Sequence, residues 1–243
     1  MTESLHLVLE YLLSPSFFKG ALTTLALTVV SMLIGMLIGL PLALLQERRS
    51  VFVRLPVLLY LWLFRGTPVL LQIVFVFNVL PLFGVVLSGF ASGVLALALN
   101  EGAYMAEIFR SGIQAVSPRQ RLAGRALGMT SAQVMRLVVL PQALRTVVPP
   151  TGNQFMGMLK SSALVSVIAV QDLLLIADQT ASANFRYIEA LSAAAIYYLI
   201  FTTLFMVIQG YIERWVAPRR SSGRRSWSQR LISLTSAQPR SSQ

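Results

Sequence analysis

Residues 110–145 read RSGIQAVSPRQRLAGRALGMTSAQVMRLVVLPQALR and interrupt a chain that is otherwise mostly apolar. This segment, called the insert below, contains six arginines and no acidic residue. The flanking segments have a composition suited to lipid, whereas the insert has one suited to an ordered structure in water. An ordered polar insert between apolar segments predicts a multi-pass membrane protein with a surface to which a partner binds.

The composition of the whole chain also indicates an integral membrane protein. Of its 243 residues, 56% are hydrophobic and only 12% are charged, whereas globular domains carry about 25% charged residues. This length holds several spans of roughly 20 residues and leaves little room for a soluble domain. The lack of cysteine excludes disulfides, cysteine-ligated zinc, iron–sulfur clusters, thiol catalysis and lipid attachment through cysteine.

We expect an all-α membrane domain at residues 19–216 with about five transmembrane helices. The first 16 residues hold two acids and no base, so they lack the basic start of a secretory signal. Residues 1–18, which include LHLVLEYLL, are therefore expected to form an interfacial segment before an uncleaved first helix. The expected spans are Lys19–Leu45, Leu55–Leu80, Phe90–Phe109, Thr146–Val170 and Ala190–Trp215.

The distribution of arginine predicts the orientation of the spans. Arginines gather in alternate loops, at 48–54, in the insert and after residue 216. The loop at 81–89 has no charge, and the loop at 171–189 holds three acids against one arginine. This pattern places the N-terminus outside and the C-terminus in the cytoplasm. It also accounts for the net charge of +11 without a nucleic-acid partner.

The tail, residues 217–243, is rich in serine and arginine and has no sustained periodicity. We expect it to be disordered and held near anionic lipid headgroups by its charge. A dedicated lipid-binding or partner-binding role is the alternative.

Two short helices are predicted within the insert. The stretch SPRQ at 117–120 places serine at the N-cap, proline at the first helical position and glutamine at the third, which is a capping box. This helix is expected to end at Gly128, because glycine favours a left-handed C-terminal cap. The stretch TSAQ at 130–133 repeats the capping box and begins a second helix, which Pro141 is expected to end.

The first of these helices has two distinct sides. Arg121 and Arg125 lie four residues apart, a like-charge spacing that costs about 0.2–0.5 kcal/mol in an isolated helix. An anionic partner would offset this cost, either lipid headgroups or an acidic protein surface. Small residues permit close approach, and this favours a protein. The other side carries Leu122, Ala123, Ala126 and Leu127.

The spacing of Ala123-Gly124, Gly128 and the run Val138–Pro141 resembles the cytoplasmic EAA loop of ABC importer permeases. Further stretches resemble the polar amino acid branch of that family, the histidine, glutamine and opine type. Together they cover most of the chain from about Thr23 to Trp215, in the order of the family. The stretches are FRGTPVLLQ (Phe64–Gln72), AYMAEIFRSGI (Ala103–Ile113), RALGM (Arg125–Met129), LPQALR (Leu140–Arg145) and GNQFMGMLKSSALVSVI (Gly152–Ile168).

The resemblance implies a type I ABC importer permease of the bacterial inner membrane. In such importers two permease subunits form the translocation path, a cytoplasmic ATPase dimer binds their EAA loops, and a periplasmic binding protein delivers the solute. It implies a polar amino acid or a related compound, such as an opine, as solute. ATP would be bound by the ATPase, and this chain contains no G-x-x-x-x-G-K-[ST] motif. The residues assigned to ATPase coupling are Arg121, Leu122, Ala123, Gly124, Arg125, Gly128, Leu140 and Pro141.

The chain departs from the family pattern at two positions of the loop. Leu122 stands where the family has glutamate, and Gly124 replaces its second alanine. A lost charged contact at an interface costs a few kcal/mol. Docking then depends on packing and on Arg121 or Arg125, or else a second, different permease subunit keeps the glutamate. We favour this heteromeric assembly over a homodimer.

Polar residues within the spans are candidates for the translocation path. Arg65 precedes Gly66 and Pro68, which suggests a broken helix whose backbone lines a cavity. The alternative is that Leu55–Phe64 lies at the interface, which leaves Arg65 among headgroups. Lys160 lies within a span, where a cavity-facing position is favoured over snorkelling. Polar contacts to the solute, or equally hydrogen bonds between helices, are expected from Gln72, Asn78, Asn153 and Gln154.

Other residues favour structural roles. Glu101 and Glu107 are expected near the two ends of a span, which is a poor arrangement for paired-carboxylate catalysis. Glu107 has a spacing suited to an ion pair with Arg110. Gly35 and Gly39 form a G-x-x-x-G pattern, which permits close packing of helices.

A membrane-embedded enzyme and a standalone channel or carrier are the competing classes. The only histidine lies outside the expected spans, and no Ser/His pair or metal-ligating cluster is present in the sequence. Five spans do not divide into two repeated halves, and a channel has no need for a capped two-helix insert. The sequence therefore disfavours both classes.

Overall fold

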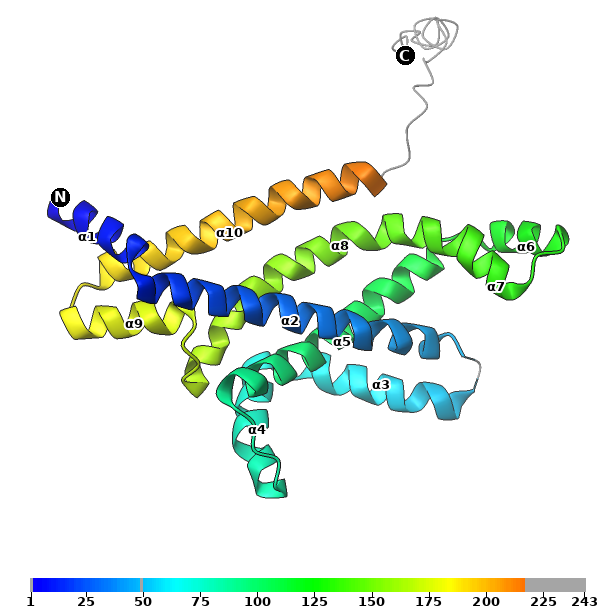
Figure 1. Ribbon diagram of the computed structural model, residues 1–243. Helices are drawn as coiled ribbons and strands as arrows, with labels where there is room; N and C mark the ends of the chain where they lie inside the picture. Colours follow the sequence, from blue (N-terminus) through cyan, green and yellow to red (C-terminus); the bar gives the residue numbers. More distant parts are fainter. Residues whose placement is uncertain (1, 49, 217–243) are drawn as a thin grey trace, which may run out of the picture.

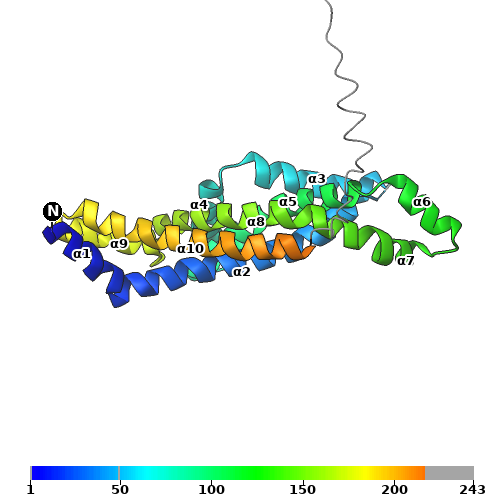
Figure 2. The same ribbon diagram turned by 90° about the horizontal axis from the view of Figure 1, so that it is seen from above.

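The protein is an elongated bundle of helices, described by a computed structural model for residues 2–48 and 50–216 (Figure 1). Throughout these residues the regular elements are helical, as expected. The helices that run along the bundle (Figures 1 and 2) are α2 (Pro15–Gln46), α5 (Gly89–Gln114), α8 (Leu140–Ser161) and α10 (Tyr187–Val216). The tail, residues 217–243, lies outside the described residues.

The shorter elements lie at the ends and bends of this bundle. They are α1 (Thr2–Leu13), α3 (Val51–Gly66), α4 (Val69–Val79), the 3-10 turn η1 (Leu80–Phe83), α6 (Pro118–Ala126), α7 (Ser131–Gln133), the π-helical turn η2 (Val134–Val139), the 3-10 segment η3 (Ser162–Ile168) and α9 (Leu173–Asn184). α1 and α9 lie at one end, and α6 and α7 lie at the opposite end (Figures 1 and 2).

Several helices of the described residues are suited to crossing a membrane. α2 and α10 qualify by length and composition alone, and the number rises to 4 if each of two bent pairs is one span. α5 has 26 residues, enough for a span of about 20, although it carries Asn100, Glu101 and Glu107. The helices expected near 19–45, 90–109 and 190–215 are present and are longer than expected. The number of five spans stays a prediction.

The expected span Leu55–Leu80 consists of two helices. The chain breaks between α3 and α4, and the two parts meet at 104°. Thr67 is extended, with φ −116° and ψ 146°, which is typical of a residue before proline. Pro68 has no N–H with which to continue the helical ladder. The broken helix suggested by Gly66 and Pro68 is therefore present.

The expectation that Pro141 ends the second helix of the insert is wrong. η2 joins α7 to α8 without interruption, and the amide of Leu140 bonds to the carbonyl of Met135, one residue further back than in an α-helix. Pro141 lies in the first turn of α8, where the pairing changes from π to α, so that its missing N–H breaks no regular ladder. The helix of the fourth expected span therefore begins well before Thr146, because one continuous helix runs from the insert into α8.

α2 and α5 pack closely at the two glycines of the G-x-x-x-G pattern, as predicted. A Cβ on Gly35 would lie 2.6 Å from Cγ of Glu101, and a Cβ on Gly39 would lie 2.7 Å from Cβ of Met105. Only glycine permits this approach. The buried core beside this contact includes Leu27, Ile73, Leu97, Met158 and Val165.

Candidate coupling loop and translocation path

The first helix of the insert begins at a serine cap. The Ser117 hydroxyl accepts a hydrogen bond of 3.3 Å from the amide of Arg119, and Pro118 is the first residue of α6. The N-cap is therefore confirmed. Within the described residues, however, the side chain of Gln120 makes no reciprocal bond to the Ser117 amide. The full capping box expected at 117–120 is absent, because Ser117 caps the second helical amide instead of the third.

The turn after α6 is a Schellman motif. Gly128 is left-handed, with φ +80°. Its amide bonds to the carbonyl of Arg125 at 2.9 Å, and the amide of Met129 bonds to the carbonyl of Gly124 at 3.1 Å. These two bonds pair carbonyls that the end of a helix otherwise leaves free. The predicted glycine stop is confirmed.

The second capping box is complete. The amide of Gln133 donates to the Thr130 hydroxyl at 3.2 Å, and the Thr130 amide donates to Oε1 of Gln133 at 2.8 Å. Behind these caps the insert has a small core of its own, formed by Ile113, Val116, Val134, Val139 and Ala143 with Met129 and Val138. The insert is thus an ordered helical pair.

Two residues of the predicted coupling set serve this internal packing. A Cβ on Gly124 would lie 3.1 Å from Cγ2 of Val134, so glycine permits α6 to approach η2. The guanidinium of Arg121 donates through Nη2 to the carbonyl of Ile113, near the end of α5. Arg121 therefore fixes α6 to α5. Arg125, four residues further on, is exposed.

The outer side of α6 is apolar and exposed. Leu122 is 67% exposed and Leu127 is 83% exposed, and Ala123 and Ala126 lie exposed beside them. Leu140 and Pro141 are also exposed, at the start of α8. These side chains form an apolar ridge on the ordered insert, and α6 lies at the far end of the molecule (Figures 1 and 2). An exposed apolar ridge of this kind is typical of a surface to which a partner protein binds.

The break between α3 and α4 forms a second candidate site, centred on Arg65. Its Nη1 lies 3.9 Å from Oε2 of Glu107, and its guanidinium lies 5.6 Å from the ring centre of Tyr104. The two charged side chains are 44% and 33% exposed. They line an open cleft of 420 Å³ between α3 and α5, together with Leu58, Leu61, Trp62 and Gly66.

The depth of this break follows from two hydrogen bonds. Asn100, near the middle of α5, donates to the carbonyl of Phe64 at 2.8 Å. The Tyr60 hydroxyl donates to the carbonyl of Leu99 at 2.5 Å. The end of α3 therefore lies level with the middle of α5. The Arg65–Glu107 ion pair lies beyond this level, at the last turn of α3 and about two turns before the end of α5. Charged pairs within a helical membrane bundle are candidates for a functional site.

Gln72 stabilises the break itself. The Nε2 of Gln72 donates to the carbonyls of Phe64 at 3.0 Å and Thr67 at 3.1 Å. Its Oε1 accepts a hydrogen bond of 3.1 Å from Asn100. Gln72 is buried, with 8% of its surface exposed. Of the two interpretations of Gln72, hydrogen bonding between helices is the one that these contacts favour.

The polar residues of α8 divide between two environments. Gln154 donates to Oε2 of Glu101 at 3.1 Å and thus joins α8 to α5. Asn153 and Lys160 are exposed and lie seven residues apart, on the same side of the helix. Asn78, on α4, donates only to the carbonyl of Val74 in its own helix, at 2.9 Å.

Glu101 was expected near the end of a span, and this expectation is wrong. It lies in the middle of α5, is 1% exposed and packs against Gly35. Glu107, by contrast, makes the expected ion pair with Arg110, at 3.7 Å. Arg110 also lies 3.4 Å from Glu47, at the end of α2. The contact between Arg110 and Glu47 could not be predicted from sequence spacing, because the two residues are far apart in the sequence.

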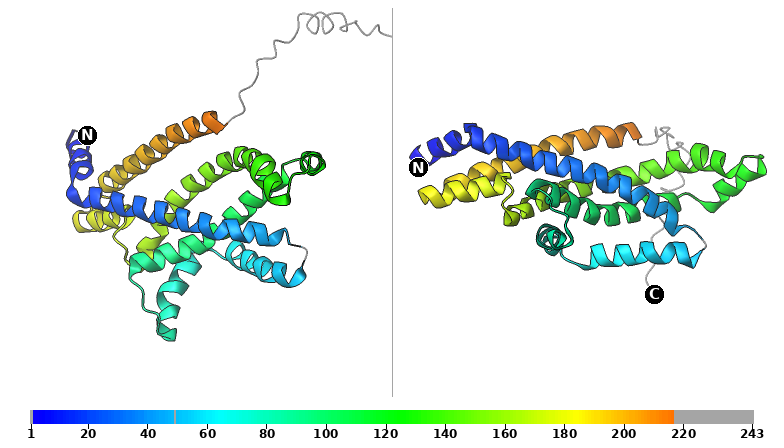
Figure 3. Two further views of the ribbon diagram at one scale, coloured as in Figure 1. Left: turned by 45° about the vertical axis from the view of Figure 1, so that its right-hand side comes forward. Right: turned by 60° about the horizontal axis from the view of Figure 1, so that its bottom comes forward.

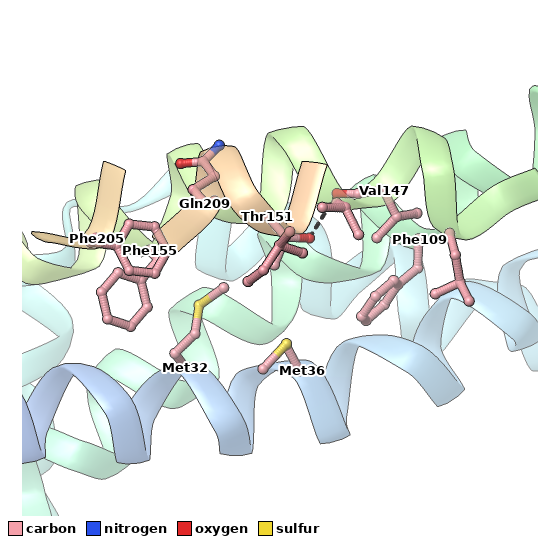
Figure 4. Close-up of a pocket in the computed structure, with 12 residues that line it drawn as sticks. Met32, Met36, Phe109, Val147, Thr151, Phe155, Phe205 and Gln209 are labelled. Carbon is pink, nitrogen blue, oxygen red and sulfur yellow. Dashed lines mark hydrogen bonds between the residues drawn. The ribbon is translucent and has the colours of Figure 1, made fainter. Parts of the chain in front are cut away.

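A second cavity, of 340 Å³, lies between α2, α8 and α10 (Figure 4). Its lining includes Met32, Met36 and the stacked rings of Phe155 and Phe205, whose centres are 3.9 Å apart. The Thr151 hydroxyl donates to the carbonyl of Val147 at 2.9 Å, so it is already paired. This cavity offers a charged solute no counter-charge. The Arg65 cleft is therefore the better candidate for a polar path.

Comparisons with known proteins agree with these features. A model of the family described as "Binding-protein-dependent transport system inner membrane component" matches residues 31–218. The chain is 39% identical over 219 residues to the arginine transport system permease protein ArgU of Corynebacterium glutamicum, covering 84% of this chain and 69% of that one. It is 33% identical over 202 residues to the glutamine transport system permease protein GlnP of Escherichia coli strain K12, covering 82% and 92%.

Solved structures give the same result. The crystal structure of an amino acid ABC transporter with histidines matches with a TM-score of 0.77 and 43% identity, over 82% of this chain and 94% of that one. The methionine ABC transporter MetNI, in an inward-facing conformation, matches with a TM-score of 0.70 over 83% and 96%. At 21% identity, the second likeness shows the fold alone.

The family match covers most of the chain, and it agrees with the ordered set of motifs found in the sequence. The fold is that of an all-α importer permease, and the protein is a transport subunit rather than an enzyme. It resides in the inner membrane as a multi-pass protein. The chain belongs to the family of binding-protein-dependent transport system inner membrane components, the permease subunits of ABC importers.

Proposed function

We propose that this chain forms the translocation path for a polar amino acid or a related compound, such as an opine. Relatives named as arginine and glutamine permeases support this class of solute. A periplasmic binding protein delivers the solute, and a cytoplasmic ATPase dimer binds and hydrolyses ATP. The permease itself binds no cofactor in this scheme.

The observation that carries the proposal is the exposed pair of Arg65 and Glu107 in the cleft beside the helix break. An amino acid carries a carboxylate and an ammonium group, which match a guanidinium and a carboxylate. At 3.9 Å the pair is loose, and Glu107 also lies 3.7 Å from Arg110. The solute carboxylate therefore binds Arg65, and its ammonium group shares Glu107 with Arg110. Tyr104, under the guanidinium, holds Arg65 in place between solutes.

The remaining path residues have different roles in this proposal. Asn153 and Lys160, exposed on one side of α8, line the path where the second permease subunit completes it. Gln72 and Gln154 are positioning residues, since their side chains hold the α3–α4 break and the α5–α8 contact.

Coupling to the ATPase takes place at the insert, residues 110–145. The apolar ridge with Leu122 and Leu127 enters a groove on the ATPase, and Arg125 meets acidic groups at its rim. Closure of the ATPase dimer favours one arrangement of the spans and its opening favours the other, which is alternating access by differential binding. Arg121 transmits the displacement to α5 through its bond to Ile113.

Leu122 also bears on the assembly. A leucine in place of the family glutamate gives this subunit an apolar contact with the ATPase. A second, different permease subunit that keeps the glutamate would supply the charged contact, and we favour this heteromer over a homodimer. The division into an interfacial segment (1–18), a membrane domain (19–216) and a basic cytoplasmic tail (217–243) is part of the same proposal.

Solute uptake into proteoliposomes that contain the permease, its ATPase and its binding protein tests the path. We expect Arg65→Ala and Glu107→Gln each to lower uptake at least about tenfold, which is ~1.4 kcal/mol of lost stabilisation, while basal ATP hydrolysis persists. Arg54→Ala, an exposed arginine at the other end of α3, is the matched control and should transport normally. Normal uptake by both cleft variants would remove Arg65 and Glu107 from the path.

A further inference from the structure

The first helix, α1, is held rigidly at the end of the bundle opposite the insert. The Tyr197 hydroxyl of α10 donates to the carbonyl of Leu12 at 2.6 Å. At the other end of α1, Glu3 lies 3.3 Å from Nη2 of Arg186. The ring of Tyr11 stacks on Phe17 with centres 5.7 Å apart. α1 therefore has a fixed orientation, and each of its sides has a defined environment.

The surface of α1 divides into three stripes along the helix. Val8, Tyr11 and Leu12 pack against the cluster formed by α2, α9 and α10. Glu3, His6 and Glu10 are exposed and polar. The third stripe is apolar yet uncovered, since Leu5, Leu9 and Leu13 are 68%, 53% and 84% exposed. Residues four apart lie on the same side of a helix, so these three leucines form one continuous ridge.

The surface of α2 next to α1 along the chain is also apolar and exposed. Beyond the bend at Ser14-Pro15, α2 exposes Phe18, Leu22 and Leu37, which are 56%, 50% and 74% exposed. α2 has 32 residues and is thus about 48 Å long, whereas the hydrocarbon core of a bilayer is about 30 Å thick. α2 is therefore about 18 Å longer than the hydrocarbon core, so its ends extend to the level of the headgroups.

α1 does not continue along the axis of α2 but turns away from it (Figure 3, left). A helix at headgroup level that runs across the bundle can place one stripe in lipid and another in water. The chemistry of α1 matches this arrangement, because its apolar and acidic stripes are adjacent and separate.

We propose that α1 docks on the bilayer leaflet opposite the insert, with Leu5, Leu9 and Leu13 in the boundary between headgroups and acyl chains. Glu3, His6 and Glu10 face water. Residues 2–13 contain no lysine or arginine, so the attachment depends on apolar burial and not on anionic lipid. The inference rests on the membrane location of the chain and is independent of which solute it carries.

The lack of cysteine in the chain makes site-directed spin labelling a direct test. Leu5→Cys, Leu9→Cys and Leu13→Cys are compared with His6→Cys and Glu10→Cys, each labelled with a nitroxide in the assembled importer in phosphatidylcholine liposomes. Leu37→Cys on α2 serves as the lipid-facing reference. Uptake by each labelled variant verifies that it has folded.

We expect labels at 5, 9 and 13 to be relaxed more by oxygen than by a water-soluble nickel chelate, with the ratio reversed at 6 and 10. Replacing a third of the lipid with phosphatidylglycerol should leave both ratios unchanged. Preferential relaxation of the leucine-site labels by nickel would place the ridge in water and overturn the proposal. Protection from both reagents would also overturn it, because a second copy or the binding protein would then cover the ridge.

Discussion

Gly35 of α2 lies directly against Glu101 of α5, and a Cβ added to the glycine would lie 2.6 Å from Cγ of the glutamate. Glu101 is 1% exposed, and its Oε2 accepts a hydrogen bond of 3.1 Å from Gln154 of α8. Three long helices thus meet around one carboxyl group. The packing at Gly35 is therefore a sensitive measure of the integrity of the bundle.

Gly35→Ala is expected to destabilise the protein by about 1–3 kcal/mol, because the added methyl group must displace Glu101 and the backbone of Gly102. Thermal unfolding in detergent measures the change. Gly210→Ala is the control, since nothing lies within 4 Å of a Cβ at that position and alanine favours the helix. Equal midpoints for the two variants would contradict the packing described for α2 and α5.

Gly128→Val is expected to uncouple ATP hydrolysis from the solute. A branched residue at φ +80° costs about 1–2 kcal/mol, so the turn after α6 loosens and the ridge loses its fixed position. The measurements are hydrogen exchange over residues 118–127 and ATP hydrolysis stimulated by the loaded binding protein. Gly128→Asn, which tolerates the left-handed region, should retain most of the stimulation. Full stimulation in the valine variant would exclude the insert as the coupling element.

Leu122→Asp is expected to weaken ATPase binding by at least about tenfold, or ~1.4 kcal/mol. The leucine is 67% exposed in this subunit, so the fold should tolerate the change, whereas an apolar groove on the partner should not accept an unpaired charge. Co-purification with the ATPase at several protein concentrations measures the loss. Leu122→Met keeps the apolar contact and should bind like the parent. Undiminished binding by the aspartate variant would mean that Leu122 lies outside the interface.

Gln72→Leu is expected to destabilise the α3–α4 break by about 1–3 kcal/mol, because the carbonyls of Phe64 and Thr67 lose the bonds from Nε2 of Gln72, and Asn100 keeps only its bond to Phe64. Solute uptake should fall with the thermal midpoint. Asn78→Leu is the control, since Asn78 is bonded only within its own helix. A Gln72 variant with the parent midpoint but no uptake would instead assign Gln72 a direct contact with the solute.

Local features of the insert were predictable from the sequence. The serine cap at 117, the glycine turn at 128 and the capping box at 130–133 each depend on residues within four positions of one another. The G-x-x-x-G contact was predictable as well, since its spacing defines one side of a helix. The class of protein was also predictable, because the family motifs occur along the sequence in the order of the family.

Features that join distant segments could not be predicted in this way. The inward turn of Arg121 depends on the position of Ile113 at the end of another helix. The position of Glu101 in the middle of α5 depends on its packing against Gly35 of α2, a contact between distant segments. The prediction that Pro141 ends a helix was wrong because a π-helical turn changes the backbone hydrogen bonding just before it. No pattern of residues predicts such a turn.

The π-helical turn has a mechanical consequence. Since η2 joins α7 to α8, the segment Ser131–Ser161 is one continuous helix of about 45 Å, with Pro149 and Pro150 inside it. Close to its midpoint this helix packs against α5. Gly112 of α5 leaves room for Val147, whereas a Cβ at position 112 would not fit. Under the proposed coupling, a displacement of the insert by the ATPase would therefore be carried past this contact, along one continuous helix, toward Lys160.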